Sequence, residues 1–233
     1  MHDRPRLWWL GPAVQGFIAG TLTPAVLWLW STGALDGLTG ADTPFFWYVS
    51  RASGITAYLL LTAAMVLGLG VFTRLFDPVA PRASSFALHE HTSWLALGFT
   101  GLHAAALLLD RSQPFGLAQV LVPFVAAYRP VPVGLGVLAL YGAGLLTASF
   151  ALKSWLGHRT WRTLHYLSFG IYVLATLHGL LDGSGTGQAW VQWLYLGSSA
   201  TVFFLALYRT LLPPRSGAPR SGTPARDQAR TAS

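Results

Sequence analysis

The sequence predicts an all-α integral membrane protein, a six-helix transmembrane bundle with both termini in the cytoplasm. Its composition is 53% hydrophobic with a mean hydropathy of +0.48, and only 10% of its residues are charged. A soluble domain carries about 25% charged residues, so this composition is typical of a chain in a bilayer. Two further observations support the prediction: the number of long apolar runs, and the way basic residues alternate between the connections. A length of 233 residues is enough for one domain.

Six apolar runs are long enough to span, because a helix needs about 20 residues to cross the hydrocarbon core. They cover residues 7–30, 53–72, 85–109, 131–152, 161–181 and 189–212. The first run is longer than the 7–15 apolar residues of a signal peptide, and we interpret it as a span. The stretch 113–130 is broken by three prolines and predicts a short interfacial helix on the outer side.

The connections between these runs alternate in charge. One set, together with the two termini, holds twelve of the fifteen basic residues, whereas the other holds Arg51, Arg111 and Arg129. By the positive-inside rule both termini are cytoplasmic, and the third and fifth helices both run from inside to outside. This distribution indicates a multi-pass protein of the cell inner or plasma membrane, with the lipid bilayer as its surrounding. It is not a nucleic-acid-binding pattern.

The chain divides into three parts: an N-terminal transmembrane helix with its outer loop (1–46), the main membrane domain (47–212) and a basic tail predicted to be disordered (213–233). The chain contains no cysteine. That excludes thiolate-ligated iron–sulfur clusters, covalently attached c-type haem and disulfides. Any redox cofactor must be held by His, Met or non-covalent contacts.

Histidines are concentrated on the third and fifth predicted helices. His89 and His103 lie 14 residues apart on the third, and His165 and His178 lie 13 apart on the fifth. At 1.5 Å per residue each pair is separated by about 20 Å along its helix. Because the two helices run in the same direction, His89 can face His165 and His103 can face His178. Each facing pair can ligate one haem iron axially, which predicts two haems b.

One spacing departs from this picture. Fourteen residues place His89 and His103 on one face, but thirteen leave His178 about 140° away from His165 on an ideal helix. Either the two macrocycles are rotated relative to each other, or the fifth helix bends or tightens near Gly170. The sequence leaves both alternatives open.

Three segments carry a resemblance to a known family: ALHEHTSWLALGFTGLHAAALLLD (87–110), LVPFVAAYRPVPVGLGVLALYGAGLL (121–146) and HRTWRTLHYLSFGIYVLATLHGLL (158–181). With the weaker match SRASGITAYLLL (50–61), they resemble the ferric reductase-like transmembrane domain. That superfamily includes NADPH oxidases, ferric reductases and the haem-binding membrane subunit of the methionine sulfoxide reductase system. The similarity covers residues 47–212, and the paired histidine spacing is its most specific element.

The resemblance implies that His89 and His165 bind an inner haem, and His103 and His178 an outer one. Unlike fuller members of the superfamily, this sequence has no Gly-rich dinucleotide loop after a strand and no segment for a flavin or nicotinamide domain. A separate cytoplasmic flavin reductase or membrane quinol is then the expected electron donor, and the acceptor lies outside.

Several other residues are weaker candidates. Arg82, Arg159 and Arg162 at the inner helix ends either follow the positive-inside rule or pair with haem propionates. Arg129 on the outer side is a candidate to pair with a propionate of the outer haem. His91 points about 200° away from His89, which favours a packing or supporting role over a ligand swap.

The sequence therefore predicts a membrane b-type cytochrome, the haem subunit of a transmembrane electron-transfer system and an oxidoreductase. The alternative is a non-redox membrane protein, either a proton-coupled transporter or an anchor or assembly subunit, whose histidines line a polar path.

Overall fold

The computed structural model describes residues 44–110, 115–183 and 185–211. All regular structure within these ranges is helical, and five helices there are long and apolar enough to cross a membrane. This confirms an all-α, multi-pass class. The first predicted span (7–30) and the C-terminal tail lie outside the described residues, and the side of the membrane on which the termini lie stays a prediction.

The five spans follow the predicted order. They are α3 (Phe45–Thr73), α4 (Arg82–Leu109), α6 (Pro130–Ala151), the pair α8 (His158–His165) with α9 (Leu167–Asp182), and α10 (Ala189–Leu211). Two short helices, α5 (Leu117–Leu121) and α7 (Lys153–Leu156), lie in the connections. The short helix α5 falls inside the stretch where an interfacial helix was predicted.

The largest boundary difference is at α3, which begins eight residues before the predicted Ser53. Polar residues lower the hydropathy of that first segment, but the helix satisfies them. The Ser53 hydroxyl donates to the Val49 carbonyl at 2.6 Å, and the Arg51 guanidinium stands 5.3 Å from the ring centre of Trp47. Hydroxyl groups bonded to a preceding helical carbonyl are compatible with a helix inside a membrane.

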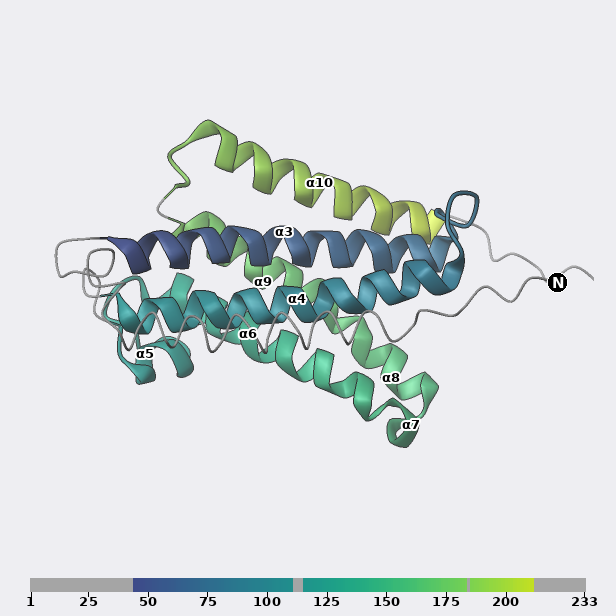
Figure 1. Cartoon of the computed structure of the whole chain (residues 1–233), viewed down its shortest axis with the longest axis horizontal. Coiled ribbons are helices and arrows are strands. Elements are labelled where there is room, and N and C mark those ends of the chain that lie inside the picture. Colours follow the sequence, from purple (N-terminus) through teal and green to yellow (C-terminus); the bar gives the residue numbers. More distant parts are fainter. Residues whose placement is uncertain (1–43, 111–114, 184, 212–233) are drawn as a thin grey trace, which may run out of the picture.

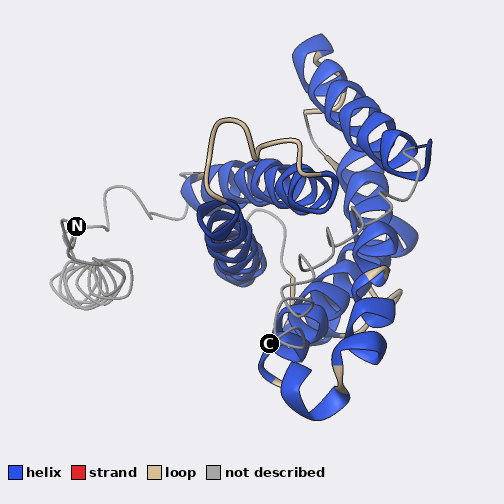
Figure 2. Cartoon of the chain, turned by 90° about the vertical axis from the view of Figure 1, so that its right-hand side faces the viewer, coloured by secondary structure: helices blue, strands red, loops and turns tan. Residues whose placement is uncertain are grey.

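The spans form two antiparallel pairs. Helix α3 packs along α4, α6 packs along α9, and α10 lies against α3 (Figures 1 and 2). Helix α4 and the α8–α9 span run in the same direction along the long axis (Figure 1). The parallel course that the sequence predicted for the third and fifth helices is therefore found.

The fifth span is interrupted at Tyr166. The backbone N–H of Tyr166 donates to the Thr163 carbonyl, and that of Phe169 donates to the Tyr166 carbonyl, at 3.2 and 3.1 Å. Such i→i−3 bonds mark a tightened turn with more rotation per residue than an α-helix. The extra rotation moves His178 toward the face of His165. The tightening lies at Tyr166, four residues before Gly170, which lies within α9.

A cluster of hydroxyl groups joins α3, α9 and α10 inside the bundle. The Tyr58 hydroxyl lies 2.8 Å from the Ser198 hydroxyl and 3.1 Å from the Tyr172 hydroxyl. The Tyr58 and Tyr195 rings are in contact, with centres 4.5 Å apart. Hydrogen bonds between helices stabilise membrane bundles by about 0.6–2 kcal/mol each, so this cluster holds α10 against α3.

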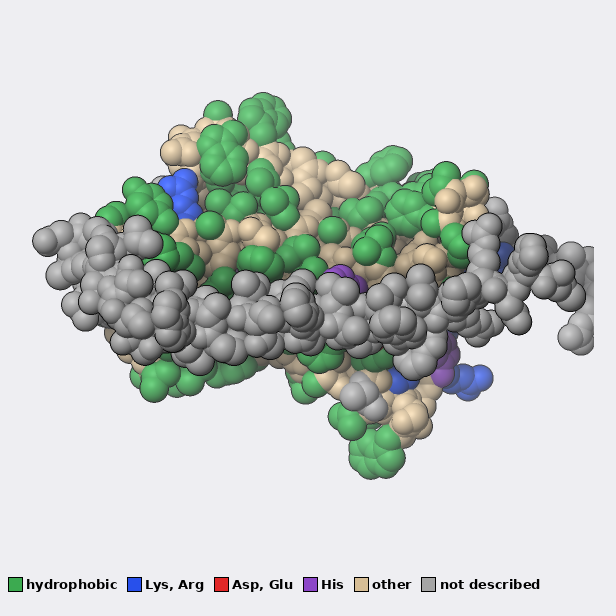
Figure 3. Space-filling view, in the orientation of Figure 1, with side chains coloured by type: hydrophobic (Ala, Val, Ile, Leu, Met, Phe, Trp, Pro, Cys, Tyr) green, Lys and Arg blue, Asp and Glu red, His purple; other side chains and the backbone are tan. Residues whose placement is uncertain are grey.

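Apolar side chains cover the outside of the bundle. Leu145 and Phe203 are 73% and 70% exposed. Figure 3 shows hydrophobic side chains along the length of the visible face and Lys and Arg toward its ends. An apolar surface of this extent needs an apolar surrounding, which agrees with spans embedded in lipid.

Candidate functional site

Four imidazoles form two facing pairs between α4 and the α8–α9 span. The ring centres of His89 and His165 lie 6.1 Å apart with an interplanar angle of 76°. Those of His103 and His178 also lie 6.1 Å apart, with an angle of 71°. The four histidines predicted from the sequence are therefore brought together in the predicted combinations.

The Nδ1 atom of three of these rings is hydrogen-bonded to a main-chain carbonyl of a neighbouring helix. His89 bonds the Ala64 carbonyl at 2.9 Å, His103 the Ser50 carbonyl at 2.8 Å and His178 the Pro132 carbonyl at 2.9 Å. A carbonyl oxygen only accepts, so Nδ1 carries the proton in each ring. In a neutral imidazole the lone pair is then on Nε2. Metal-ligating histidines are oriented in this way in proteins.

A glycine follows each of the three carbonyls at the fourth position. The pairs are Ser50 with Gly54, Ala64 with Gly68, and Pro132 with Gly136. A Cβ atom would lie 2.9 Å from Nδ1 of His103 at Gly54, 3.1 Å from the His89 ring at Gly68 and 2.7 Å from Nδ1 of His178 at Gly136. We call this arrangement the carbonyl–glycine notch. Because the glycine has no side chain, the imidazole can approach the carbonyl closely enough to bond to it.

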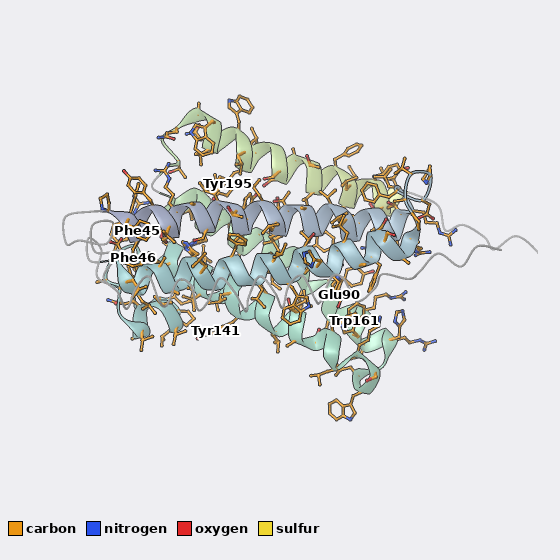
Figure 4. The ribbon with its side chains drawn as sticks, in the orientation of Figure 1. Phe45, Phe46, Glu90, Tyr141, Trp161 and Tyr195 are labelled. Atoms are coloured by element: carbon orange, nitrogen blue, oxygen red, sulfur yellow. The ribbon has the colours of Figure 1, made fainter. Side chains whose placement is uncertain are left out.

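His165 is held differently. Its Nδ1 atom is buried, and no acceptor among the described residues lies within hydrogen-bonding distance. Near this histidine, the end of α6 contributes Phe150, whose ring centre lies 6.0 Å from that of Trp161. The Trp161 ring stacks on His165, with ring centres 4.9 Å apart and planes at 27°. Trp161 lies toward the end of the bundle at which α4 begins (Figure 4).

All four histidines line one continuous cavity of about 1090 Å³. Sites for single small molecules usually enclose about 300–1,000 Å³, so this cavity is large for one ligand. Its walls include residues of α3, α4, α6, α8, α9 and α10, and most of its lining is apolar. The space between the two helix pairs can therefore hold an extended, largely apolar group at each histidine pair.

The geometry of each pair fits an iron bound from two sides. Metal–imidazole bonds measure about 2 Å, so two opposed Nε2 ligands hold their ring centres about 6 Å apart. Among the described residues, no group of three or more His, Cys, Asp or Glu could hold a metal ion. Two facing imidazoles would supply only two ligands of an iron, and a flat macrocycle would have to supply the others.

The predicted basic residues differ in their placement. All four are exposed; Arg82 and Arg162 line the cavity, whereas Arg129 and Arg159 are not part of its lining. The Arg129 guanidinium donates to the Leu181 carbonyl at 2.5 Å and so joins the start of α6 to the end of α9. The four roles predicted for these arginines stay predictions. His91 is exposed and does not line the cavity, and its predicted role stays a prediction.

Some site residues were not predicted. The glycines of the notches are the clearest case, although Gly54 and Gly68 are 14 residues apart, the same spacing as His89 and His103. Lys153 and Arg209 also line the cavity. The Arg209 guanidinium lies 3.8 Å from the Phe72 ring centre and donates to the Tyr166 hydroxyl at 2.8 Å.

Comparison of the chain with protein-family models, with curated proteins and with solved structures gives no match. The resemblance to the ferric reductase-like transmembrane domain therefore stays a prediction carried by the three quoted segments.

Proposed function

We propose that this protein is a membrane b-type cytochrome that moves electrons across the bilayer through two haems, one between His89 and His165 and one between His103 and His178. The observation that carries the proposal is the pairing itself. Ring centres 6.1 Å apart in both pairs leave room for one iron between each two imidazoles. Three of the four rings also have Nδ1 committed to a carbonyl, which leaves Nε2 as the ligand atom.

In this proposal haem supplies the one-electron chemistry, and the chain supplies binding, orientation and electrostatics. The carbonyls of Ser50, Ala64 and Pro132 hold three imidazoles in one tautomer and one orientation. Hydrogen bonding of this kind also makes the ring a stronger donor to the metal. The mostly apolar cavity wall suits the apolar part of such a cofactor.

The two pairs are spaced for transfer along the membrane normal. His89 and His103 are separated by 14 residues of continuous helix, or about 21 Å at 1.5 Å per residue. By the positive-inside rule, His89 and His165 belong to the cytoplasmic half. The electron donor is then a separate cytoplasmic flavin reductase or membrane quinol, and the acceptor lies outside. This assignment includes membership of the ferric reductase-like superfamily.

Basic residues suit the anionic groups of such a cofactor. Arg82 and Arg162 line the cavity near the cytoplasmic pair, where a haem propionate would gain a charge-assisted hydrogen bond. Arg129, bonded to the Leu181 carbonyl beside the outer pair, is the corresponding residue at the other end.

The test is the haem content of the purified chain. We expect a dithionite-reduced minus oxidised spectrum with b-type bands, and two haems per chain by pyridine haemochrome. Replacement of His103 or His178 by alanine should leave about one haem per chain, and His91→Ala, as the matched control on α4, should leave two. A folded wild-type chain that takes up no haem would refute the proposal, and so would an unchanged content in both ligand variants.

A further inference from the structure

His165 differs from the other three imidazoles in what covers it. Trp161, one turn earlier on α8, stacks on its ring at 4.9 Å. The Lys153 ammonium stands over the same indole, 4.4 Å from the ring centre, and 5.5 Å from that of Phe150. Lys153, Trp161 and His165 therefore form a continuous stack that ends at the cytoplasmic histidine pair. We call it the Lys153 stack.

The local backbone builds this stack. Lys153 begins the short helix α7, and Gly157 separates α7 from α8 with a φ of 77°. A positive φ is open to glycine without a steric penalty, and the sharp turn there brings α7 back beside α8. Trp161 and His165 are four residues apart on α8, a spacing that places side chains next to each other. The charge of Lys153 is thereby held close to a cytoplasmic ligand.

Two properties of this arrangement favour a reduced iron. A ferrous iron carries one positive charge less than a ferric iron, so a nearby ammonium stabilises the reduced form. In addition, Nδ1 of His165 has no carbonyl acceptor among the described residues, and an imidazole without that hydrogen bond is a weaker donor to the metal. Both effects act on an iron held between His89 and His165, and both raise its reduction potential.

We propose that the Lys153 stack raises the reduction potential of the cytoplasmic haem, with Lys153 and Trp161 as positioning residues that act through His165. The inference rests on the proposed function, since it needs a haem between His89 and His165. For a unit charge about 12 Å from an iron, an effective dielectric constant of about 20 corresponds to a change of about tenfold in the reduction equilibrium, or ~59 mV for a one-electron couple.

Potentiometric titration of the haem-loaded chain tests this. Lys153→Met removes the charge and should lower the reduction potential of one of the two haems. The expected change is about tenfold in the equilibrium constant for its reduction. Lys153→Arg keeps the charge and should leave the transitions in place. Arg74→Asn is the control that also removes one positive charge. Arg74 lies in the connection between α3 and α4, outside the cavity lining. Its backbone is in a left-handed conformation, which Asn tolerates. It should shift neither transition.

Two histidine variants show which haem Lys153 affects, and a Trp161 variant shows whether the effect depends on the indole. With His103→Ala only the cytoplasmic haem remains, and Lys153→Met should still lower its potential; with His89→Ala the effect should disappear. Trp161→Leu should lower the same transition, and Lys153→Met should add little to it, because the two act through one contact. Arg82, Glu90, Arg162 and Arg209 are unchanged in every variant, so the difference isolates Lys153.

The outcomes separate the two proposals. A haem-free wild-type chain overturns the proposed function. Two bound haems with potentials unchanged in Lys153→Met, or shifted equally in Lys153→Met and Arg74→Asn, overturn the inference about the Lys153 stack and leave the cytochrome proposal standing.

Discussion

The imidazole of His178 lies directly against Gly136: a Cβ atom at Gly136 would come within 2.7 Å of Nδ1. The same ring donates to the Pro132 carbonyl one turn earlier on α6. Any side chain at Gly136 therefore competes with the histidine for the space that gives access to this carbonyl.

Gly136→Ala should remove the haem of the outer pair. At 2.7 Å the ring must move, and a ring that loses its carbonyl also loses its orientation toward His103. We expect about one haem per chain by pyridine haemochrome. Gly144→Ala on the same helix meets no atom within 4 Å and should keep two. Equal haem content in the two variants would mean that the notch at Gly136 is not needed.

Gly68→Ala should have a weaker effect on the cytoplasmic pair. There the Cβ would lie 3.1 Å from the His89 ring, so a shift of a few tenths of an ångström relieves the contact. We expect two haems per chain but faster loss of one of them to an apolar haem acceptor, measured as the decay of absorbance over time. Gly98→Ala, which meets nothing within 4 Å on α4, is the control. Complete loss of one haem would show that the site tolerates no displacement.

The orientation of the rings predicts a spectroscopic signature. The planes of the facing imidazoles cross at 76° and 71°, and nearly perpendicular axial ligands leave two iron d orbitals close in energy. Both ferric haems should therefore give low-spin electron paramagnetic resonance signals of large anisotropy. Signals typical of parallel imidazoles from both haems would contradict the ring orientations.

Tyr58→Phe should loosen α10. The Tyr58 hydroxyl lies within hydrogen-bonding distance of the hydroxyls of Ser198, Tyr172 and Thr176, and a buried hydroxyl cluster that loses a member is destabilised by about 1–3 kcal/mol. A lower thermal unfolding midpoint in detergent is expected, with haem stoichiometry unchanged. Tyr208→Phe on α10, where Tyr208 is 39% exposed, should leave the midpoint in place.

The all-α membrane class and the pairing of the four histidines could be predicted because both depend on quantities read along the sequence, namely hydropathy and residue spacing. Hydropathy over about 20 residues locates a span, and the spacing of His89 and His103 is a multiple of the helical repeat. The 13-residue spacing of His165 and His178 conflicted with that repeat. The turn at Tyr166 that compensates it has no Gly or Pro to mark it.

The surroundings of the histidines could not be predicted in the same way. A bond such as that from His103 to the Ser50 carbonyl joins residues 53 positions apart and depends on how two helices are rotated against each other. The spacing of Gly54 and Gly68 is a sequence pattern that could have indicated the notches, but single glycines are common in membrane helices. The stack of Lys153 on Trp161 depends on the turn at Gly157 and appears only once that turn is folded.

Helix α3 supports both proposed haems although it ligates neither. The carbonyls of Ser50 and Ala64 belong to one uninterrupted helix, so a displacement of α3 along α4 would release His103 and His89 together. A displacement of α6 would release His178 alone, through Pro132. The two histidine pairs thus share α3 as a support on one side of the cavity, through Ala64 and Ser50, whereas α6 contacts only His178 among the four rings by such a bond.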